Sequence, residues 1–327
     1  MGHLWSAFVG ETFPPATKFH VSDIPDMSGK VILVTGANTG IGKETARVLL
    51  TKNAKVYIAC RDKVKDEAAI GELKMSTGNE AIFLQLDLAN LRSVKAAAET
   101  FISKEPLLNV LFNNAGVFNP PVEMLTDDGY DLQFGTNVLG HFYFTKLVMP
   151  ALLAAAATSS DGTARVVNTA SNTHWLSGLD YNTFRDSAAR RRMNTWTRYG
   201  QSKTGNVVFS TELARRYGNQ GIVSTALSPG GIKTEIARHH SSFTQAFFNL
   251  FFRDVSHGAL TQLYAGTTVE GAQLNGKVSP LLPTQPVLIL DQYLIHCARI
   301  GNPRAETQDP QQGMELWNWL EEQVKDV

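Results

Sequence analysis

The sequence predicts an α/β fold: a single, mostly parallel, doubly wound sheet of about seven strands, flanked by helices. Apolar, β-branched runs such as 31–34 alternate along the chain with segments whose apolar residues recur at helical spacing. Several of these runs stop at small or polar residues, which places such residues at the end of the sheet where α/β proteins bind ligands. With 327 residues, 43% of them apolar, the chain can bury one large core, so we expect one main domain.

The composition favours small neutral partners. Thirty basic and thirty acidic residues give no net charge, which speaks against nucleic acid or an anionic membrane as partner. Cys60 and Cys297 are too few for a disulfide framework and lack metal-ligand spacing, so we expect packing residues, a site without metal and a reducing, cytoplasmic location. We expect no transmembrane segment, because no run reaches the roughly eighteen apolar residues that spanning a bilayer needs, and at most association with a membrane surface.

Residues 1–29 are expected to form an N-terminal arm ahead of the main domain, 30–327. The arm is rich in aromatic residues and proline and lacks the features of a secretion signal. Gly2 fits the loose pattern for N-myristoylation, although His3 and Trp5 are bulky where such sites usually have small residues. We therefore favour an apolar arm that packs on the domain.

A glycine-rich turn follows the first predicted strand and opens a helix near Ile41. Glycine lets a dinucleotide's pyrophosphate lie against bare backbone N–H groups at the positive end of that helix. The spacing differs from the commoner Gly-x-Gly-x-x-Gly pattern, so the turn alone is a weak signal. The residues expected to bind the cofactor here are Gly36, Asn38, Thr39, Gly40, Ile41 and Gly42.

The next two predicted strands, 55–60 and 81–88, carry candidates for the adenosine end of the cofactor. In a dinucleotide fold the end of the second strand meets the ribose, where arginine pairs with a 2′-phosphate. Arg61 therefore favours NADP(H) over NAD(H), the alternative being a solvated Arg61 beside Asp62 as a helix N-cap. Asp87, followed by Leu88, is expected to cap the next helix, to contact adenine, or to do both.

The fourth predicted strand, 109–113, runs into a second glycine turn. Its small residues would let the backbone approach the cofactor ribose, while asparagine side chains tie the turn to the neighbouring strand. The cofactor contacts expected here are Asn114, Ala115 and Gly116.

Four further residues carry the candidate chemistry. Asn137 lies inside the helical segment 130–157, where asparagine is mildly unfavourable and needs a reason. The strand 164–170 stops at Ser171, which places this serine at the ligand-binding end of the sheet. Tyr199 and Lys203 lie one turn apart on one face of a later helix.

In this order, the motifs resemble the short-chain dehydrogenase/reductase family over roughly residues 30–276. Residues 35–42 are similar to the family's cofactor turn and 113–116 to its Asn-Asn-Ala-Gly motif. The family's four catalytic positions match Asn137, Ser171, Tyr199 and Lys203, the last two of which also contact the cofactor. Its nicotinamide-side loop matches Pro229, Gly230, Ile232 and Thr234.

Thr-Gly-Ala-Asn-Thr-Gly-Ile-Gly, Ala-Cys-Arg-Asp and Asn-Val-Leu-Gly-His more narrowly resemble the retinol-dehydrogenase-like branch, with its fungal alcohol dehydrogenase and aldehyde reductase relatives. The resemblance implies a Rossmann-type domain, NADP(H), and apolar aldehydes, ketones or alcohols as substrates.

Hydride transfer to a carbonyl builds negative charge on its oxygen, which requires a proton donor and a group that binds the oxygen. We expect Tyr199 to donate the proton and Ser171 to bind the oxygen. A free phenol titrates near pH ~10, so Lys203 would stabilise the phenolate while it reaches the nicotinamide ribose. Asn137 would hold Lys203 through a water.

Two segments around the site look irregular. Between Ser171 and Tyr199, the basic run 190–192 predicts a solvated excursion at the mouth of the site, and His174 is expected in a loop hydrogen bond rather than at the substrate. At about 235–255, five phenylalanines in a helix-like segment predict a mobile lid with an apolar inner face. The alternative is a patch that faces a membrane or a second copy of the chain in a homodimer.

The segment 278–292 looks inserted. Without its fifteen residues, Lys277 joins Tyr293 directly, giving a turn followed by the expected last strand. The length preserves the reading frame, and codons for Val278 and Gln292 can supply intron ends, so a translated intron and a genuine surface loop both stay open. After it, 311–324 has apolar residues at helical spacing and predicts a docking helix.

Three functions fit these expectations. The first is NADPH-dependent reduction of an apolar aldehyde or ketone. The second is an NADP-dependent alcohol dehydrogenase that works oxidatively, since the cofactor ratio sets the direction. The third is a non-enzymatic dinucleotide-binding scaffold, against which the complete set of catalytic residues argues. We favour the first.

Overall fold

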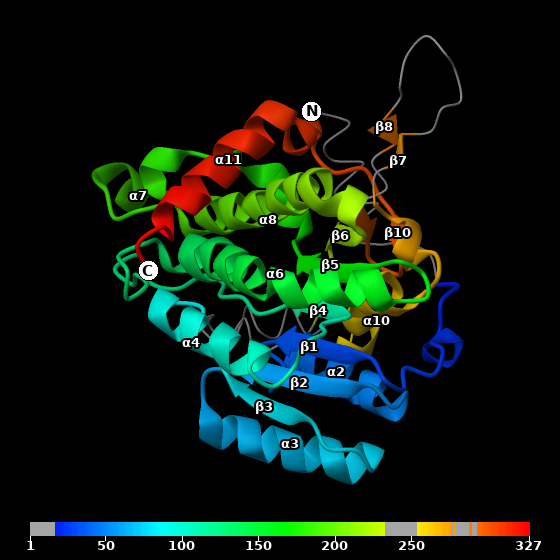
Figure 1. Cartoon of the computed structure of the whole chain (residues 1–327). Coiled ribbons are helices and arrows are strands. Elements are labelled where there is room, and N and C mark those ends of the chain that lie inside the picture. Colours follow the sequence, from blue (N-terminus) through cyan, green and yellow to red (C-terminus); the bar gives the residue numbers. More distant parts are fainter. Residues whose placement is uncertain (1–16, 233–253, 276, 279–287, 290–292) are drawn as a thin grey trace.

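The computed structural model describes residues 17–232, 254–275, 277–278, 288–289 and 293–327. Within them, eight strands form one sheet in the order β10-β9-β6-β5-β4-β1-β2-β3 (Figure 1). All neighbours pair in parallel except β10 with β9, so the predicted doubly wound sheet is confirmed, with a short antiparallel edge strand in addition. The strands are β1 (Val31–Thr35), β2 (Lys55–Cys60), β3 (Ile82–Gln85), β4 (Val110–Asn113), β5 (Ala164–Thr169), β6 (Ile222–Leu227), β9 (Tyr293–Ile295) and β10 (Arg299–Ile300).

Helices cover both faces of the sheet, and α11 crosses the outside of α8 (Figure 1). One face carries α2 (Gly40–Thr51), α3 (Lys63–Thr77) and α10 (Val255–Thr267). The other carries α4 (Leu91–Ile102), α6 (His141–Thr158) and α8 (Thr195–Tyr217), with α11 (Pro310–Gln323) outside them. Shorter pieces are α5 (Leu132–Phe134), the π-helix η2 (Gly135–Gly140), α7 (Ala188–Arg192) and the 3₁₀ turns η1 (Val21–Asp23), η3 (Asn172–Leu176), η4 (Tyr181–Thr183), η5 (Gly218–Gln220), η7 (Gly271–Gln273) and η8 (Ala305–Gln308).

Strand β1 separates two hydrophobic cores. Ile32 and Val34 pack into the core under α2 and α10, whereas Val31 and Leu33 pack into the core under α4, α6 and α8. Side chains alternate between the faces of a strand, so a strand buried on both faces needs apolar residues throughout. This explains why β1 reads as a continuous apolar run.

Helix α11 confirms the docking helix expected near the C-terminus. Asp309 caps it by accepting a hydrogen bond from the Gln311 backbone N–H at 2.9 Å, and Pro310 occupies the first helical position. Leu316 and Leu320 are buried on α11, and the Trp317 ring packs edge-on against Phe142 with ring centroids 5.1 Å apart.

One helical run, Leu132–Thr158, is long and apolar enough to cross a membrane by length and composition. It is an exception to the expectation that no segment would qualify. However, 72% of its most apolar window is buried inside the protein, as in the core helix of a globular domain.

Several expectations fall wholly or partly outside the described residues. These include Gly2 in the arm, Thr234 and most of the predicted lid, and 279–287 and 290–292 of the segment that looks inserted. In the described part of the arm, Phe19, Ile24 and Met27 are buried.

The described parts of 277–289 form a separate small sheet. β7 (Lys277–Val278) and β8 (Leu288–Ile289) pair antiparallel outside the main sheet. β9 pairs in parallel with β6, as expected for the last main strand after 292. Whether 278–292 is a loop or a translated intron stays a hypothesis.

Candidate active site

The chain changes direction between β1 and β4, and the two glycine turns meet at this point. From β1 the chain proceeds to β2 and β3 on one side, whereas β4 lies on the other side, which leaves the crevice where α/β folds bind ligands. Gly36 follows β1 with φ of 65°, and a Cβ there would lie 2.9 Å from the Ala115 Cα. Asn114 Nδ2 donates to the Thr35 carbonyl at 2.8 Å, which ties the second turn to the first as expected.

The N-terminus of α2 is suited to a pyrophosphate. Gly40 starts the helix with φ of 57°, and the N-cap Thr39 makes no side-chain capping hydrogen bond. Since the first N–H groups of a helix lack intrahelical partners, they can donate to an anion at the positive end of the helix dipole. At Gly42 a Cβ would lie 2.5 Å from the Gly36 carbonyl oxygen, so the protein itself already requires glycine there.

A buried hydrogen-bond chain that the sequence did not suggest connects both turns to Asn137. The Thr35 hydroxyl accepts hydrogen bonds from the Asn114 and Ala115 backbone N–H groups, both at 2.9 Å, and lies 2.9 Å from His141 Nε2. His141 Nδ1 lies 3.0 Å from the Asn137 carbonyl, which can only accept, so Nδ1 carries the proton. Burial lowers the pKa of His141 to about 4, which keeps the imidazole neutral near pH 7.

Asn137 lies in the π-helical turn η2 and uses both amide hydrogens. Its Oδ1 accepts from the Val117 N–H at 2.8 Å, and its Nδ2 donates to the Val117 carbonyl at 3.1 Å and to Ser202 Oγ at 3.0 Å. A Cβ at Gly116 would lie 3.2 Å from Asn137 Oδ1 and 3.7 Å from Lys203 Nζ, so both residues border this glycine. The water-mediated link from Asn137 to Lys203 stays a prediction.

Ser171, Tyr199 and Lys203 come from the end of β5 and the first turns of α8. Ser171 caps η3 by accepting from the Thr173 N–H at 3.2 Å. Lys203 Nζ lies 5.5 Å from the centre of the Tyr199 ring, which confirms the shared helix face, and donates to the Thr169 carbonyl at 2.8 Å.

Burial disfavours the charged form of both Tyr199 and Lys203. It raises the pKa of the Tyr199 phenol well above its usual range, although a hydrogen bond with Ser171 opposes this. It also lowers the pKa of Lys203 to about 7. The phenol of Tyr199 therefore keeps its proton near pH 7 in the absence of bound ligands.

At the predicted adenosine end, the structure corrects one expectation. Arg61 is exposed, and Asp62 is the N-cap of α3. The expected capping role of Asp87 is wrong: the N-cap of α4 is Asn90, three residues further along the chain. Instead, Asp87 Oδ1 accepts from the Ala89 N–H at 2.9 Å, which closes a turn between β3 and α4.

The loop after β6 brings Pro229, Gly230 and Ile232 to the same end of the sheet. Gly230 has φ of 83°, and a Cβ there would lie 2.7 Å from the His296 ring, so glycine is required by conformation and by packing. Ile232 is buried, and Thr234 lies outside the described residues.

In the segment between Ser171 and Tyr199, the solvated excursion that the basic run 190–192 predicts is confirmed for Arg191 and Arg192, which are exposed, and is wrong for Arg190. Arg190 is fully buried, because the carboxylate of Asp131 lies 3.0 Å from its Nε and compensates its charge inside the protein. His174 makes the expected loop hydrogen bond, with Nδ1 2.7 Å from the Ser171 carbonyl.

Together, the fold and the site define a dinucleotide-binding α/β protein with a serine, a tyrosine and a lysine at the ligand-binding end of its sheet. No group of three or more His, Cys, Asp or Glu is arranged to hold a metal ion in the part of the chain that the structure describes.

Comparisons with known proteins identify the family. The model of the short chain dehydrogenase family matches residues 30–183. A short-chain dehydrogenase/reductase of Armillaria gallica is 52% identical over 326 residues, covering 100% of both chains. Human retinol dehydrogenase 12 is 39% identical over 254 residues, covering 77% of both chains. The crystal structure of 3-ketoacyl-(acyl-carrier-protein) reductase from Brucella melitensis complexed with NADH is 25% identical, has a TM-score of 0.59, and covers 76% of this chain and 95% of that one.

The chain therefore belongs to the short-chain dehydrogenase/reductase family and is an NAD(P)-dependent oxidoreductase.

Proposed function

We propose that this enzyme uses NADPH to reduce an apolar aldehyde or ketone to the alcohol, with Tyr199 as the general acid. The observation that carries the proposal is the grouping of Tyr199 with Lys203 and Ser171, because Lys203 also borders Gly116, which ends the second cofactor turn. A nicotinamide held along the two glycine turns would meet this group.

Each residue has a distinct role in the proposed reaction. Bound NADPH supplies the hydride that adds to the carbonyl carbon. Tyr199 gives its phenolic proton to the carbonyl oxygen, so that the product is a neutral alcohol. The Ser171 hydroxyl turns about its Cβ–Oγ bond to donate to the same oxygen. Lys203, in its protonated form, stabilises the phenolate that remains, and Asn137 holds the backbone of the second cofactor turn in place.

The preference for NADPH rests on Arg61. This side chain is exposed directly after β2, where a guanidinium can pair with a 2′-phosphate. Because one solved relative is a complex with NADH, the family alone does not decide between the two dinucleotides. The direction follows the cofactor ratio in the cell, so the same site would also oxidise the alcohol.

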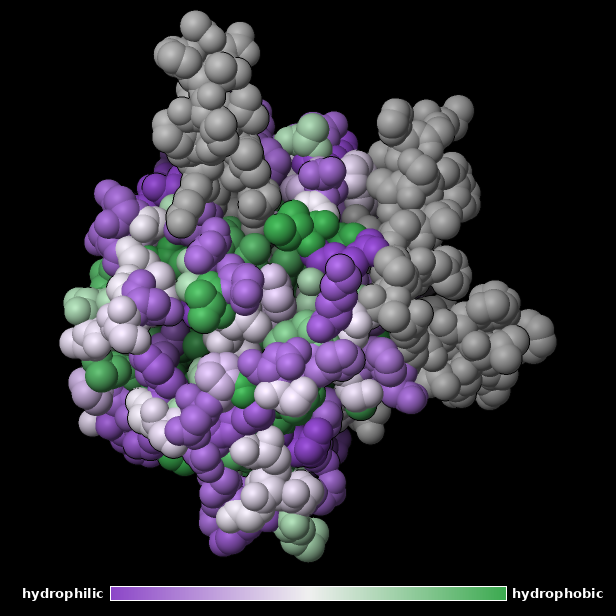
Figure 2. Space-filling view, turned by 90° about the vertical axis from the view of Figure 1, so that its right-hand side faces the viewer, coloured by the Kyte–Doolittle hydropathy of each residue, from purple (hydrophilic) through white to green (hydrophobic). Residues whose placement is uncertain are grey.

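The apolar substrate class is proposed from two observations. The Tyr199 ring packs against Phe118, with ring centroids 4.6 Å apart, and one relative is named as a retinol dehydrogenase. On the face shown in Figure 2, hydrophilic side chains predominate and hydrophobic ones form smaller areas between them. We propose a cytoplasmic enzyme that associates at most with a membrane surface; a homodimer is a further proposal.

Replacing Tyr199 with phenylalanine tests the central claim. The variant should bind NADPH as the wild type does, measured by nucleotide fluorescence, while turnover of an aldehyde falls by ~10²–10⁴-fold, since the proton donor is lost. Tyr217→Phe, at the far end of the same helix, is the matched control and should leave turnover unchanged. Near-normal turnover of Tyr199→Phe would end the assignment.

A further inference from the structure

We propose that Gln133 is a positioning residue for the substrate. It fixes two aromatic side chains, Phe118 and Trp196, on which one substituent of the carbonyl compound packs, and so decides which way round an unsymmetric ketone binds. The inference rests on the proposed carbonyl reduction and adds a substrate-orienting wall to it.

The wall consists of three rings in contact. Phe118 packs edge-on against Tyr199, with centroids 4.6 Å apart and an interplanar angle of 65°. Phe118 also packs edge-on against Trp196, with ring centroids 4.9 Å apart and an interplanar angle of 71°. Trp196 is 42% exposed, so its indole reaches solvent, whereas Tyr199 holds the reactive phenol. A substrate whose carbonyl oxygen meets Tyr199 therefore has one substituent beside these rings.

Phe118 and Trp196 belong to separate segments, and Gln133 joins the two. Gln133 Oε1 accepts from the backbone N–H of Asn119, directly after Phe118, at 3.1 Å. Its Nε2 donates to the carbonyl of Thr195, directly before Trp196, at 3.2 Å. Both ends of one buried amide are thus used to hold the backbone next to an aromatic residue.

The backbone at Asn119 has an uncommon conformation. Its φ of 56° is left-handed, which few residues other than glycine adopt, although asparagine is among those that tolerate it. The bond from the Asn119 N–H to Gln133 constrains this backbone, and the direction of the Phe118 side chain depends on the turn that follows it.

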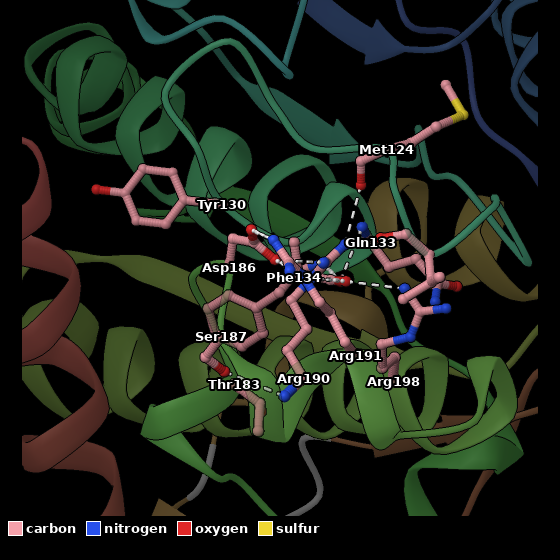
Figure 3. A network of polar contacts seen from close by, with 12 residues as sticks. Met124, Tyr130, Gln133, Phe134, Thr183, Asp186, Ser187, Arg190, Arg191 and Arg198 are labelled. Atoms are coloured by element: carbon pink, nitrogen blue, oxygen red, sulfur yellow. Dashed lines mark hydrogen bonds and ion pairs between the residues drawn. The ribbon is translucent and has the colours of Figure 1, made fainter.

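A buried charge network holds Gln133 itself (Figure 3). Asp131 Oδ1 accepts from the Gln133 N–H at 3.0 Å, and its Oδ2 faces Arg190 Nε at 3.0 Å and Arg198 Nη1 at 3.2 Å. Arg190 in turn donates to the Met124 carbonyl at 3.0 Å, in the segment that carries Phe118. Since Arg198 precedes Tyr199, the network joins the catalytic helix α8 to both sides of the wall.

The inference makes a stereochemical prediction. The hydride arrives from one side, so the orientation of an aryl methyl ketone sets the enantiomer of the alcohol formed. A ring–ring contact that favours one orientation contributes about three- to tenfold to the enantiomer ratio. Loss of the wall should therefore reduce that ratio by about this factor.

The experiment measures the enantiomer ratio of 1-phenylethanol formed from acetophenone with NADPH, together with melting temperatures. Gln133→Met keeps the side-chain length but makes neither hydrogen bond, and should lower the ratio about three- to tenfold. Gln133→Glu keeps the acceptor for Asn119 and should rescue part of the ratio. Phe118→Leu and Trp196→Leu should lower it as Gln133→Met does.

Gln201→Met is the matched control. Gln201 is also buried and also uses both ends of its amide, accepting from the Asp180 N–H at 2.8 Å and donating to Thr183 Oγ1 at 2.9 Å, but these bonds hold the segment 180–183 and not the backbone beside Phe118 or Trp196. It should lower the melting temperature without changing the ratio.

Each outcome of this experiment either supports the inference or overturns it. An unchanged ratio in folded Gln133→Met overturns the role of Gln133; if that variant does not fold, an unchanged ratio in both Phe118→Leu and Trp196→Leu overturns the wall. A wild type that reduces neither acetophenone nor any other carbonyl compound in a panel overturns the proposed function, and the inference with it. If the wild type reduces carbonyl compounds but all these variants give the same enantiomer ratio as the wild type, the inference is overturned and the proposed function is not.

Discussion

Replacing Lys203 with methionine should make the folded protein more stable while it removes activity. Lys203 is only 3% exposed, and burial lowers the pKa of its ammonium group from 10.5 to about 7. At pH 7 the lysine of the unfolded chain is fully protonated and solvated. In the folded protein, burial of the same cation costs free energy and so lowers the free energy of unfolding. The pKa difference corresponds to about 4 kcal/mol of lost stability at this pH.

Methionine fills the volume of the lysine chain without the charge. The Thr169 carbonyl, which accepts from Lys203 Nζ, also accepts from Asn206 Nδ2 at 3.1 Å, so the substitution leaves no unpaired carbonyl. Allowing for imperfect packing, we expect a gain of about 2–4 kcal/mol. For a chain of 327 residues this raises the melting temperature by roughly 3–6 °C.

The gain should depend on pH in a defined way. Below pH 7 both folded and unfolded lysine are protonated, so the gain is constant and at its largest. Between pH 7 and 10.5 the unfolded chain keeps a proton that the folded protein has lost, and the wild type becomes more stable as the pH rises. The advantage of methionine should therefore shrink towards zero near pH 10.5.

Thermal unfolding at pH 7 and at pH 9.5, followed by circular dichroism without nucleotide, tests this reasoning. Lys146→Met is the control, because Lys146 is partly exposed in an ion pair with Glu321 and should change the melting temperature by no more than about 1 °C. Two results would refute this reasoning: a Lys203→Met variant that melts below the wild type at pH 7, or one whose melting temperature exceeds that of the wild type by the same amount at both pH values.

Three further predictions concern the cofactor, the core and the irregular segment. Arg61→Ala should weaken NADPH binding about tenfold or more and leave NADH binding nearly unchanged, because only NADPH has a 2′-phosphate; fluorescence titration measures both, and an equal loss would make Arg61 structural. Asp131→Asn should lower the free energy of unfolding by about 3–5 kcal/mol in urea titration, because it leaves Arg190 and Arg198 buried without their shared carboxylate; an unchanged midpoint would contradict this. Deletion of 278–292 should preserve folding and carbonyl reduction, whereas an unfolded or inactive product, or a gene without splice signals there, would show that the segment belongs to the working enzyme.

The sheet could be predicted from the sequence because its physical cause is local. A strand buried on both faces is mostly apolar, so β1 and β2 appear as apolar runs, and the small or polar residue that follows each run marks the binding end of the sheet. The same holds for Tyr199 and Lys203, whose spacing of four residues places them on one helix face wherever the helix lies.

What the sequence did not disclose depends on residues far apart in the chain. Three consecutive arginines, 190–192, look equally solvated, yet Arg190 is buried because Asp131, 59 residues earlier, supplies a compensating carboxylate. His141 and Thr35 are 106 residues apart, and neither lies in a pattern that suggests the bond between them. Such pairs become visible only when the fold has brought their elements together.

The short helix α5 continues into the π-helical turn η2, and three side chains of this stretch hold different parts of the protein. Asp131 binds the guanidinium groups, Gln133 bridges the two aromatic segments, and Asn137 binds both backbone groups of Val117, so three side chains within seven residues serve three different neighbours. The Asn137 carbonyl accepts from His141 Nδ1 at 3.0 Å, and His141 Nε2 lies 2.9 Å from the Thr35 hydroxyl, which joins the proposed catalytic asparagine to the end of β1. The stretch 131–141 thus joins the proposed substrate wall, the proposed catalytic Asn137 and the end of β1 through hydrogen bonds that its own side chains make.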